Sequence, residues 1–141
     1  MKWRGGPAPA LVLKDAEGKS VNLRDFRGST VLVNFWATWC GPCVDELPAI
    51  DRLRERMAGT KFTVIAVDVG ESAARVNAFL KKTPVGFAVL LDPDSELSRK
   101  WKVHGLPTTY VIGPDGRIRF YQVGDLDWGA DAVYEQIRTV R

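Results

Sequence analysis

The sequence contains few cysteine and histidine residues, and it has no long hydrophobic run. Its 141 residues include two cysteines, Cys40 and Cys43, and one histidine, His104. A structural zinc site usually needs four such ligands, which this chain does not supply. No apolar stretch approaches the length that spans a bilayer. The sequence therefore argues against a structural zinc protein and against a transmembrane helix.

The chain also lacks any concentration of charge of one sign. Its 20 basic residues are scattered among 17 acidic ones, for a formal net charge of +3. Nucleic-acid-binding domains usually carry a clustered basic patch, so we expect no nucleic-acid partner. Residues 1–7 lack the apolar core of a signal peptide. Either the protein is cytosolic, or an export signal or membrane tether ahead of Lys2 is absent from this chain.

Length and composition predict one globular domain. Hydrophobic residues make up 45% of the chain and charged residues 26%, which is typical of folded rather than disordered proteins. A chain of 141 residues is long enough to bury a substantial core. We assign residues 1–9, which include Gly5-Gly-Pro-Ala-Pro9, to an irregular lead-in. Residues 10–141 form the single domain.

The two cysteines stand where a predicted strand meets a predicted helix. Val31 to Ala37 is apolar and rich in β-branched and aromatic residues, as a strand buried on both faces should be. After the second cysteine, apolar residues recur at spacings of three or four, which indicates an amphipathic helix. These residues are Val44, Leu47, Ile50, Leu53 and Met57. The sequence thus predicts a strand that delivers a dithiol to a helix N-terminus.

That position favours redox chemistry at the dithiol. The N-terminus of a helix has unsatisfied N–H groups and the positive end of the dipole, so Cys40 should ionise more readily than a free thiol. The thiolate is the nucleophile in disulfide exchange. Cys43, one turn further on, should be more buried and placed to attack the Cys40 sulfur. Pro42 removes an N–H that the first turn does not need.

Two plainer interpretations of the dithiol remain. A purely structural disulfide between Cys40 and Cys43 would close a very small loop and remove little chain entropy. A pair of inert buried thiols would leave the helix-start position without a purpose. Redox exchange is favoured over both, because a Cys-x-x-Cys pair near a βαβ pattern is a known redox signature.

The rest of the chain alternates predicted strands and helices. Further strands are predicted at 11–13 and 20–23, as a hairpin, and at 61–68, 87–91, 106–112 and 117–123. Further helices are predicted as one turn within 22–28, a helix capped by Ser72, a short helix starting at Asp94 or Ser95, and a final helix capped by Asp125 or Asp127. Parallel βαβ units followed by a ββα unit predict an α/β sandwich around a mixed sheet.

Several motifs resemble a known superfamily. Trp39-Cys-Gly-Pro-Cys43 matches the active-site motif of the thioredoxin superfamily, and Gly105-Leu-Pro-Thr108 resembles its cis-proline loop. The segments Gly6-Pro-Ala-Pro9, Glu46-Leu-Pro48 and Val69-Gly-Glu71 resemble the TlpA/ResA-like group within it. The similarity runs from about residue 5 to the final helix. It implies an α/β thioredoxin fold: a mixed central sheet flanked by helices, with an N-terminal β-hairpin and an αβ insertion.

The resemblance also implies a function. Proteins of this group are extracytoplasmic thiol-disulfide oxidoreductases, and many serve cytochrome c maturation or oxidase assembly. By resemblance, this protein reduces disulfides of periplasmic or outward-facing protein partners and takes electrons from an upstream thiol-disulfide donor. We expect a monomer that uses the Cys40–Cys43 disulfide and no other cofactor or metal.

Particular residues receive roles from the same resemblance. Cys40 attacks, Cys43 resolves, and Pro107 in the cis form brings the Leu106 backbone beside the dithiol, where an extended substrate can pair with it. A trans proline that starts an edge strand is the plainer alternative. Substrate contacts are expected at Trp39, Gly41, Pro42 and Leu106.

One position departs from the thioredoxin pattern. Cytoplasmic-type thioredoxins have a buried aspartate where this chain has Asn34, and an amide cannot take up a proton. Glu71, which follows a parallel strand at the same sheet end as the dithiol, is the predicted replacement. Burial there should raise its pKa and suit it to move a proton for Cys43. The alternative is a helix-start acid beside Ser72. We expect Glu46 to lie on a solvated helix face.

Other functions remain as alternatives. Cys40 and Cys43 are candidate ligands for copper(I), because thiolates suit that ion, and His104 is a candidate third ligand. Otherwise His104 is a solvated loop residue. A disulfide-donating oxidase would use the same dithiol in the opposite direction. Peroxiredoxin-type sites need Thr or Ser three residues before the reactive cysteine, where this chain has Ala37. A redox-inert interaction module would make the dithiol incidental.

Overall fold

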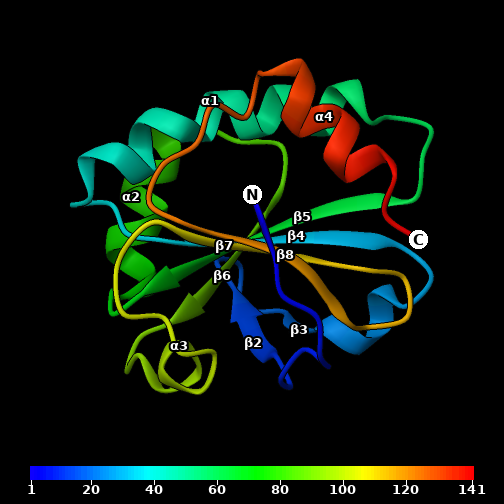
Figure 1. The fold of residues 1–141 in the computed structure, drawn as a ribbon. Coiled ribbons are helices and arrows are strands. Elements are labelled where there is room, and N and C mark those ends of the chain that lie inside the picture. Colours follow the sequence, from blue (N-terminus) through cyan, green and yellow to red (C-terminus); the bar gives the residue numbers. More distant parts are fainter.

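An eight-stranded mixed sheet forms the middle layer of the protein in a computed structural model that describes all 141 residues (Figure 1). The strands are β1 (Lys2–Trp3), β2 (Val12–Asp15), β3 (Ser20–Asn22), β4 (Thr30–Trp36), β5 (Phe62–Val69), β6 (Ala88–Asp92), β7 (Thr108–Ile112) and β8 (Ile118–Val123). They lie in the order β1-β8-β7-β4-β5-β6-β2-β3. The predicted mixed central sheet is confirmed.

Strand β4 occupies the centre of this sheet. It pairs in parallel with β5 on one side and antiparallel with β7 on the other. All seven of its residues are buried, which is why the sequence there is apolar apart from Thr30 and Asn34. Strand β6 extends the parallel part beyond β5, and β8 extends the antiparallel part beyond β7. The cysteine motif therefore begins at the end of the most protected strand.

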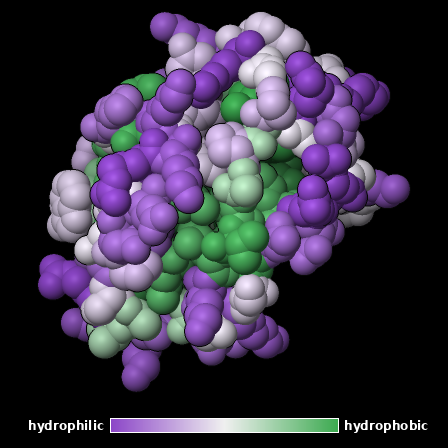
Figure 2. Space-filling view, turned by 90° about the horizontal axis from the view of Figure 1, so that it is seen from below, coloured by the Kyte–Doolittle hydropathy of each residue, from purple (hydrophilic) through white to green (hydrophobic).

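Helices cover the two faces of the sheet unequally (Figure 1). The helices are α1 (Gly41–Arg56), α2 (Ala73–Lys82), α3 (Glu96–Lys100), α4 (Asp131–Arg138) and the 3-10 turn η1 (Leu23–Phe26). Side chains of α1, α2 and α4 pack in one core cluster with Leu32, Trp36 and Val111 of the sheet. The opposite face packs against α3, η1 and the N-terminal segment. Figure 2 looks onto that face, where apolar side chains gather across the centre.

Both ends of the sheet are completed by N-terminal residues. The predicted hairpin forms from β2 and β3, and β2 also pairs with β6. Within the lead-in that the sequence predicts to be irregular, β1 pairs with β8, and Pro7 makes a bridge to Arg117. The turn between residues 22 and 28 is present as η1, capped by Asn22. The first residues thus add a strand beside β8.

Two further details concern the helices. The prediction that Asp125 or Asp127 caps the final helix is wrong, because α4 has Ala130 at its N-cap position. Asp127 instead accepts a hydrogen bond from the Gly129 N–H, which closes the turn ahead of the helix. Ser72 does cap α2, as predicted. None of the helices combines the length and hydrophobicity needed to cross a membrane.

Candidate active site

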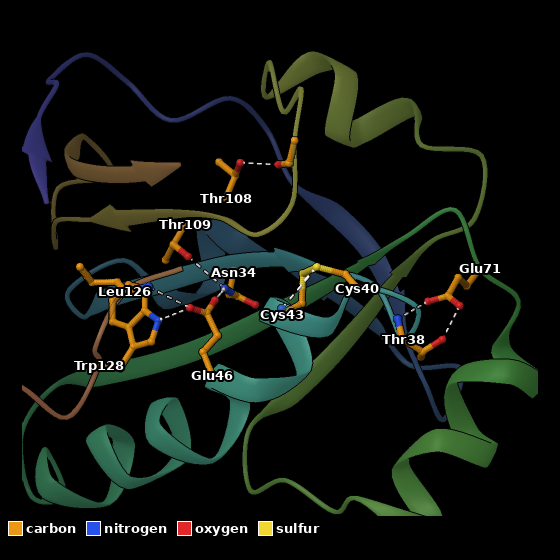
Figure 3. Close-up of a disulfide and its surroundings, with 11 residues drawn as sticks. Asn34, Thr38, Cys40, Cys43, Glu46, Glu71, Thr108, Thr109, Leu126 and Trp128 are labelled. Carbon is orange, nitrogen blue, oxygen red and sulfur yellow. Dashed lines mark hydrogen bonds between the residues drawn. A yellow bond between two sulfur atoms is a disulfide. The ribbon is translucent and has the colours of Figure 1, made fainter. Parts of the chain in front are cut away.

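The two cysteines form a disulfide at the start of α1 (Figure 3). Cys40 is the N-cap residue, and its Sγ accepts a hydrogen bond from the Cys43 N–H at 3.3 Å. Cys40 is 6% exposed, whereas Cys43 is fully buried. The predicted difference in burial is therefore confirmed, and Cys40 is the sulfur that a partner can reach.

The first turn of α1 suits a negative charge on Cys40. Gly41 and Pro42 begin a helix of 16 residues, whose free N–H groups point toward its N-terminus. The hydrogen bond from Cys43 already supplies one of these donors to the Cys40 sulfur. No acidic side chain lies in the first turn to oppose an anion. The arrangement therefore stabilises a Cys40 thiolate after the disulfide opens.

The loop before β7 lies at the same end of the sheet as the disulfide. The Leu106–Pro107 peptide bond is cis, which confirms that prediction. Thr108 follows it, pairs with Phe35 of β4, and donates its hydroxyl to the Gly105 carbonyl at 2.6 Å. This pairing fixes the loop beside the strand that carries the cysteines. Trp39 is 67% exposed at the same end of the molecule, so its ring is available to a partner.

Glu46 is buried, so the prediction of a solvated residue is wrong. Its Oε2 accepts hydrogen bonds from Trp128 Nε1 at 2.8 Å and from the Leu126 N–H at 3.3 Å. Its Oε1 accepts one from Asn34 Nδ2 at 3.1 Å. These partners come from the segment before α4 and from β4, far apart in the sequence. Figure 3 shows the carboxylate held among them.

The same carboxylate lies near the buried cysteine. Positions 43 and 46 are three apart on α1, so their side chains share one face of the helix. Burial raises the pKa of Glu46, and the hydrogen bonds from Trp128, Leu126 and Asn34 reduce this rise without cancelling it. A carboxyl group with a raised pKa takes up a proton more readily than a solvated one. Glu46 therefore has, on α1, the raised pKa that the sequence analysis predicted for Glu71.

Asn34 connects this carboxylate to the sheet. It is fully buried and donates to Glu46 and, at 2.9 Å, to Thr109 Oγ1. Its Oδ1 has no hydrogen-bond partner. The amide of Asn34 cannot take up a proton. Its hydrogen bond instead orients the carboxyl group of Glu46, which can.

Glu71 holds the loop ahead of Cys40 through hydrogen bonds to Thr38. Its Oε1 accepts the Thr38 N–H at 2.7 Å, and its Oε2 accepts the Thr38 hydroxyl at 2.6 Å (Figure 3). Arg75 Nε donates to Oε2 at 3.0 Å. Burial alone would raise the pKa of Glu71, but these bonds and one from Asp68 lower it below its usual value. The predicted rise in the pKa of Glu71 is therefore wrong.

Asp68 is a titratable residue that the sequence analysis did not single out. It lies near the end of β5, is fully buried, and accepts no hydrogen bond at either oxygen. Burial, and after it the neighbouring Glu71, raise its pKa to about 9. A protonated Asp68 has an O–H to donate to the Glu71 carboxylate. The only signal in the sequence is an acid inside an otherwise apolar strand.

No group of three His, Cys, Asp or Glu side chains is placed to hold a metal ion. His104 is exposed on the loop before Gly105, and the two sulfurs are bonded to each other. His104 does not form such a group with the two cysteines, so the copper(I) alternative would use Cys40 and Cys43 alone. Nothing in the arrangement of the side chains favours it.

Comparisons with known proteins agree with this geometry. Residues 5–121 match the AhpC/TSA family. The chain is 40% identical over 114 residues to thiol-disulfide oxidoreductase ResA of Bacillus subtilis, covering 81% of this chain and 64% of that protein. ResA of Bacillus anthracis is 33% identical over 121 residues, covering 86% of this chain and 70% of that one. The chain thus spans about two thirds of the length of these relatives.

A solved structure gives the same result for the fold. A crystal structure from Chlorobium tepidum, provisionally identified as thiol:disulfide interchange protein DsbE, has a TM-score of 0.88 and 32% identity to this chain. The superposition covers 95% of this chain and 94% of that one. The predicted thioredoxin fold is therefore confirmed over almost all of the sequence.

Proposed function

Because the chain belongs to the AhpC/TSA family and is similar to the ResA proteins of the thioredoxin superfamily, we propose that it is a thiol-disulfide oxidoreductase. It reduces disulfides of protein partners through the Cys40–Cys43 dithiol. The observation that carries this proposal is the N-cap position of Cys40, whose sulfur already accepts a helix N–H. A sulfur held in this way is stabilised as a thiolate, which exchange requires.

The reaction runs through a mixed disulfide. The Cys40 thiolate attacks one sulfur of the partner disulfide, forms a new S–S bond and releases the other partner sulfur as a thiolate. Cys43 then loses its proton and attacks the Cys40 sulfur. The second partner thiolate leaves, and the Cys40–Cys43 disulfide forms. The partner gains two electrons, and an upstream dithiol restores the protein by the same exchange in reverse.

The resolving step needs an acceptor for the Cys43 proton. Glu46 is the carboxylate that suits this task, because it is buried on the same helix face and its raised pKa makes it a better base than a solvated acid. Glu71 has a different part in the site. Its two bonds to Thr38 position the loop that carries Trp39 and Cys40.

The substrate lies along the loop that contains Pro107. An extended segment of the partner pairs with the Leu106 backbone, and Trp39, Gly41 and Pro42 line the approach to the Cys40 sulfur. Trp39, Gly41 and Pro42 are exposed, as a docking surface requires. From the resemblance to the TlpA/ResA-like group, we propose that the protein acts outside the cytoplasm, in cytochrome c maturation or oxidase assembly. We propose that it acts as a monomer.

A peroxidase function suits this site poorly. The position three residues before Cys40 is Ala37, which has no hydroxyl group. Thr38 does have one, but its hydroxyl is committed to Glu71 at 2.6 Å. The hydroxyl next to the position that a peroxidase requires is therefore already engaged with Glu71.

Trapping of the mixed disulfide tests the proposal. Reduced Cys43→Ser protein, incubated with insulin as a disulfide substrate, should accumulate an adduct that a small thiol removes, because no resolving sulfur remains. Cys40→Ser is the matched control and should accumulate far less, because the remaining sulfur is buried. Equal trapping by both variants, or trapping by Cys40→Ser alone, would contradict the assigned roles.

A further inference from the structure

A groove opens beside the loop that carries Pro107. It has a volume of about 530 Å³, and its lining includes Gly105 and Thr108, the residues on either side of Leu106 and Pro107. Tyr110 and Tyr121 line its floor on the face of β7 and β8, where their rings stack with centroids 6.5 Å apart. Because residues of the loop before β7 line it, the groove is continuous with the proposed substrate surface.

The charged side chains of this groove are all basic. Arg4 and Lys102 line it together with His104, and no aspartate or glutamate does. None of these three side chains forms an ion pair anywhere in the protein. The groove therefore has two cations without an internal counter-charge, on a protein whose net charge is already +3.

The cation at position 4 is held in place by the fold. The Arg4 N–H donates to the Arg119 carbonyl at 3.0 Å, which continues the pairing of β1 with β8. Arg4 Nη1 donates to Tyr110 Oη at 3.2 Å, and the guanidinium lies 5.5 Å from the centre of that ring. Tyr110 is buried and donates its own hydroxyl to the Trp101 carbonyl at 2.8 Å. A guanidinium fixed in this way loses little freedom when it binds an anion.

We propose that this groove binds an acidic segment of the substrate polypeptide, close in sequence to the cysteine that Cys40 attacks. This inference rests on the proposed oxidoreductase function and specifies the class of protein substrate that the enzyme accepts. Carboxylates of the segment pair with Arg4 and Lys102, while the partly exposed Tyr121 packs against the backbone and side-chain stems of an extended chain. The charge complementarity selects an acidic partner, and the continuity with Gly105 and Thr108 selects a segment of the molecule undergoing exchange.

Peptides of matched sequence test the proposal. Each peptide has one cysteine in a mixed disulfide with 2-thiopyridine. Two glutamates, or two glutamines in the matched peptide, flank this cysteine, one on each side, at a distance of two, four or six residues. Release of pyridine-2-thione in a single turnover of the reduced protein gives the second-order rate constant of exchange, which corresponds to kcat/KM. At least one glutamate peptide should exceed its glutamine counterpart by roughly fivefold at low salt, because each exposed pair contributes modestly. The ratio should fall toward one as salt screens the contacts.

Variants locate the effect on the protein. The double variant Arg4→Gln, Lys102→Gln should lower the glutamate-to-glutamine ratio to near one. Lys81→Gln, an exposed lysine on α2 outside the groove, should keep the wild-type ratio. Equal kcat/KM for the two peptide series in the wild type would overturn the groove proposal and leave the proposed function standing. Exchange with neither series would overturn the proposed function itself.

Discussion

Replacing Asp68 by asparagine should change how the stability of the protein depends on pH. Asp68 is fully buried near the end of β5, with Glu71 and Arg75 as its charged neighbours. Its pKa rises from 3.8 to about 9, first because of burial and then because of Glu71. Asparagine has nearly the same shape, keeps an N–H to donate to the Glu71 carboxylate, and never has to take up a proton.

The sign of the effect follows from proton binding. Between pH 3.8 and about 9 the folded protein holds a proton on Asp68 and the unfolded chain does not. The free energy of unfolding of the wild type therefore falls as pH rises through this window, by up to about 1.4 kcal/mol per pH unit from this group. At pH 7 the accumulated cost relative to asparagine is at most roughly 4 kcal/mol. The advantage of Asp68→Asn should grow with pH and level off above pH 9.

Urea unfolding of the oxidised protein, followed by tryptophan fluorescence at several pH values, measures this difference. Effects of all other groups largely cancel when the variant is subtracted from the wild type. Asp25→Asn, at an exposed position on η1, is the matched control and should give a difference that does not vary with pH. A constant difference between Asp68→Asn and wild type from pH 4.5 to 9 would refute the protonated state of Asp68.

Three further substitutions test the carboxylates and their partners. Glu46→Gln should remove the carboxyl-dependent part of the pH profile of exchange, measured as turnover between pH 5 and 9; Asp45→Asn, its exposed neighbour, should keep the wild-type profile. Thr38→Val removes one hydrogen bond to Glu71 and should lower the free energy of unfolding by about 1 kcal/mol in urea titrations; no loss would mean that the hydroxyl bond is not formed. Glu71→Gln should destabilise the protein most above pH 4.5 and progressively less as pH falls, because a group with a lowered pKa stabilises the fold only while it is charged; a loss that stays the same down to pH 3 would contradict this.

The strand-to-helix transition at the cysteines was predictable from the sequence because its signals are local. Residues 31–37 form an uncharged run that is apolar except at Asn34, and the spacing of Leu47, Ile50 and Leu53 indicates one buried face of α1. The position of Cys40 at the N-cap follows from these two elements alone. Local patterns of this kind survive in the folded protein, so the dithiol, its burial and the order of β4, α1 and β5 are as predicted.

The carboxylates could not be assigned correctly from local patterns. Glu46 lies on α1 next to Asp45, and its burial depends on Leu126 and Trp128, which are 80 and 82 positions further along the chain. The lowered pKa of Glu71 likewise depends on Thr38, in a different loop. Asp68 is perturbed by burial in a sheet whose strand order the sequence does not specify. Each of these charges depends on tertiary contacts, which periodicity does not contain.

The reduction potential of the Cys40–Cys43 pair tests the central claim most directly. The protein is equilibrated with a defined thiol-disulfide buffer, and the free thiols are counted by alkylation. A reductase that depends on an upstream donor should have a reduction potential near or below roughly −250 mV, close to that of thioredoxin among thiol-disulfide oxidoreductases. A potential near about −120 mV would make the protein a disulfide donor and contradict the proposed direction. Failure to form a reversible disulfide would contradict the redox function altogether.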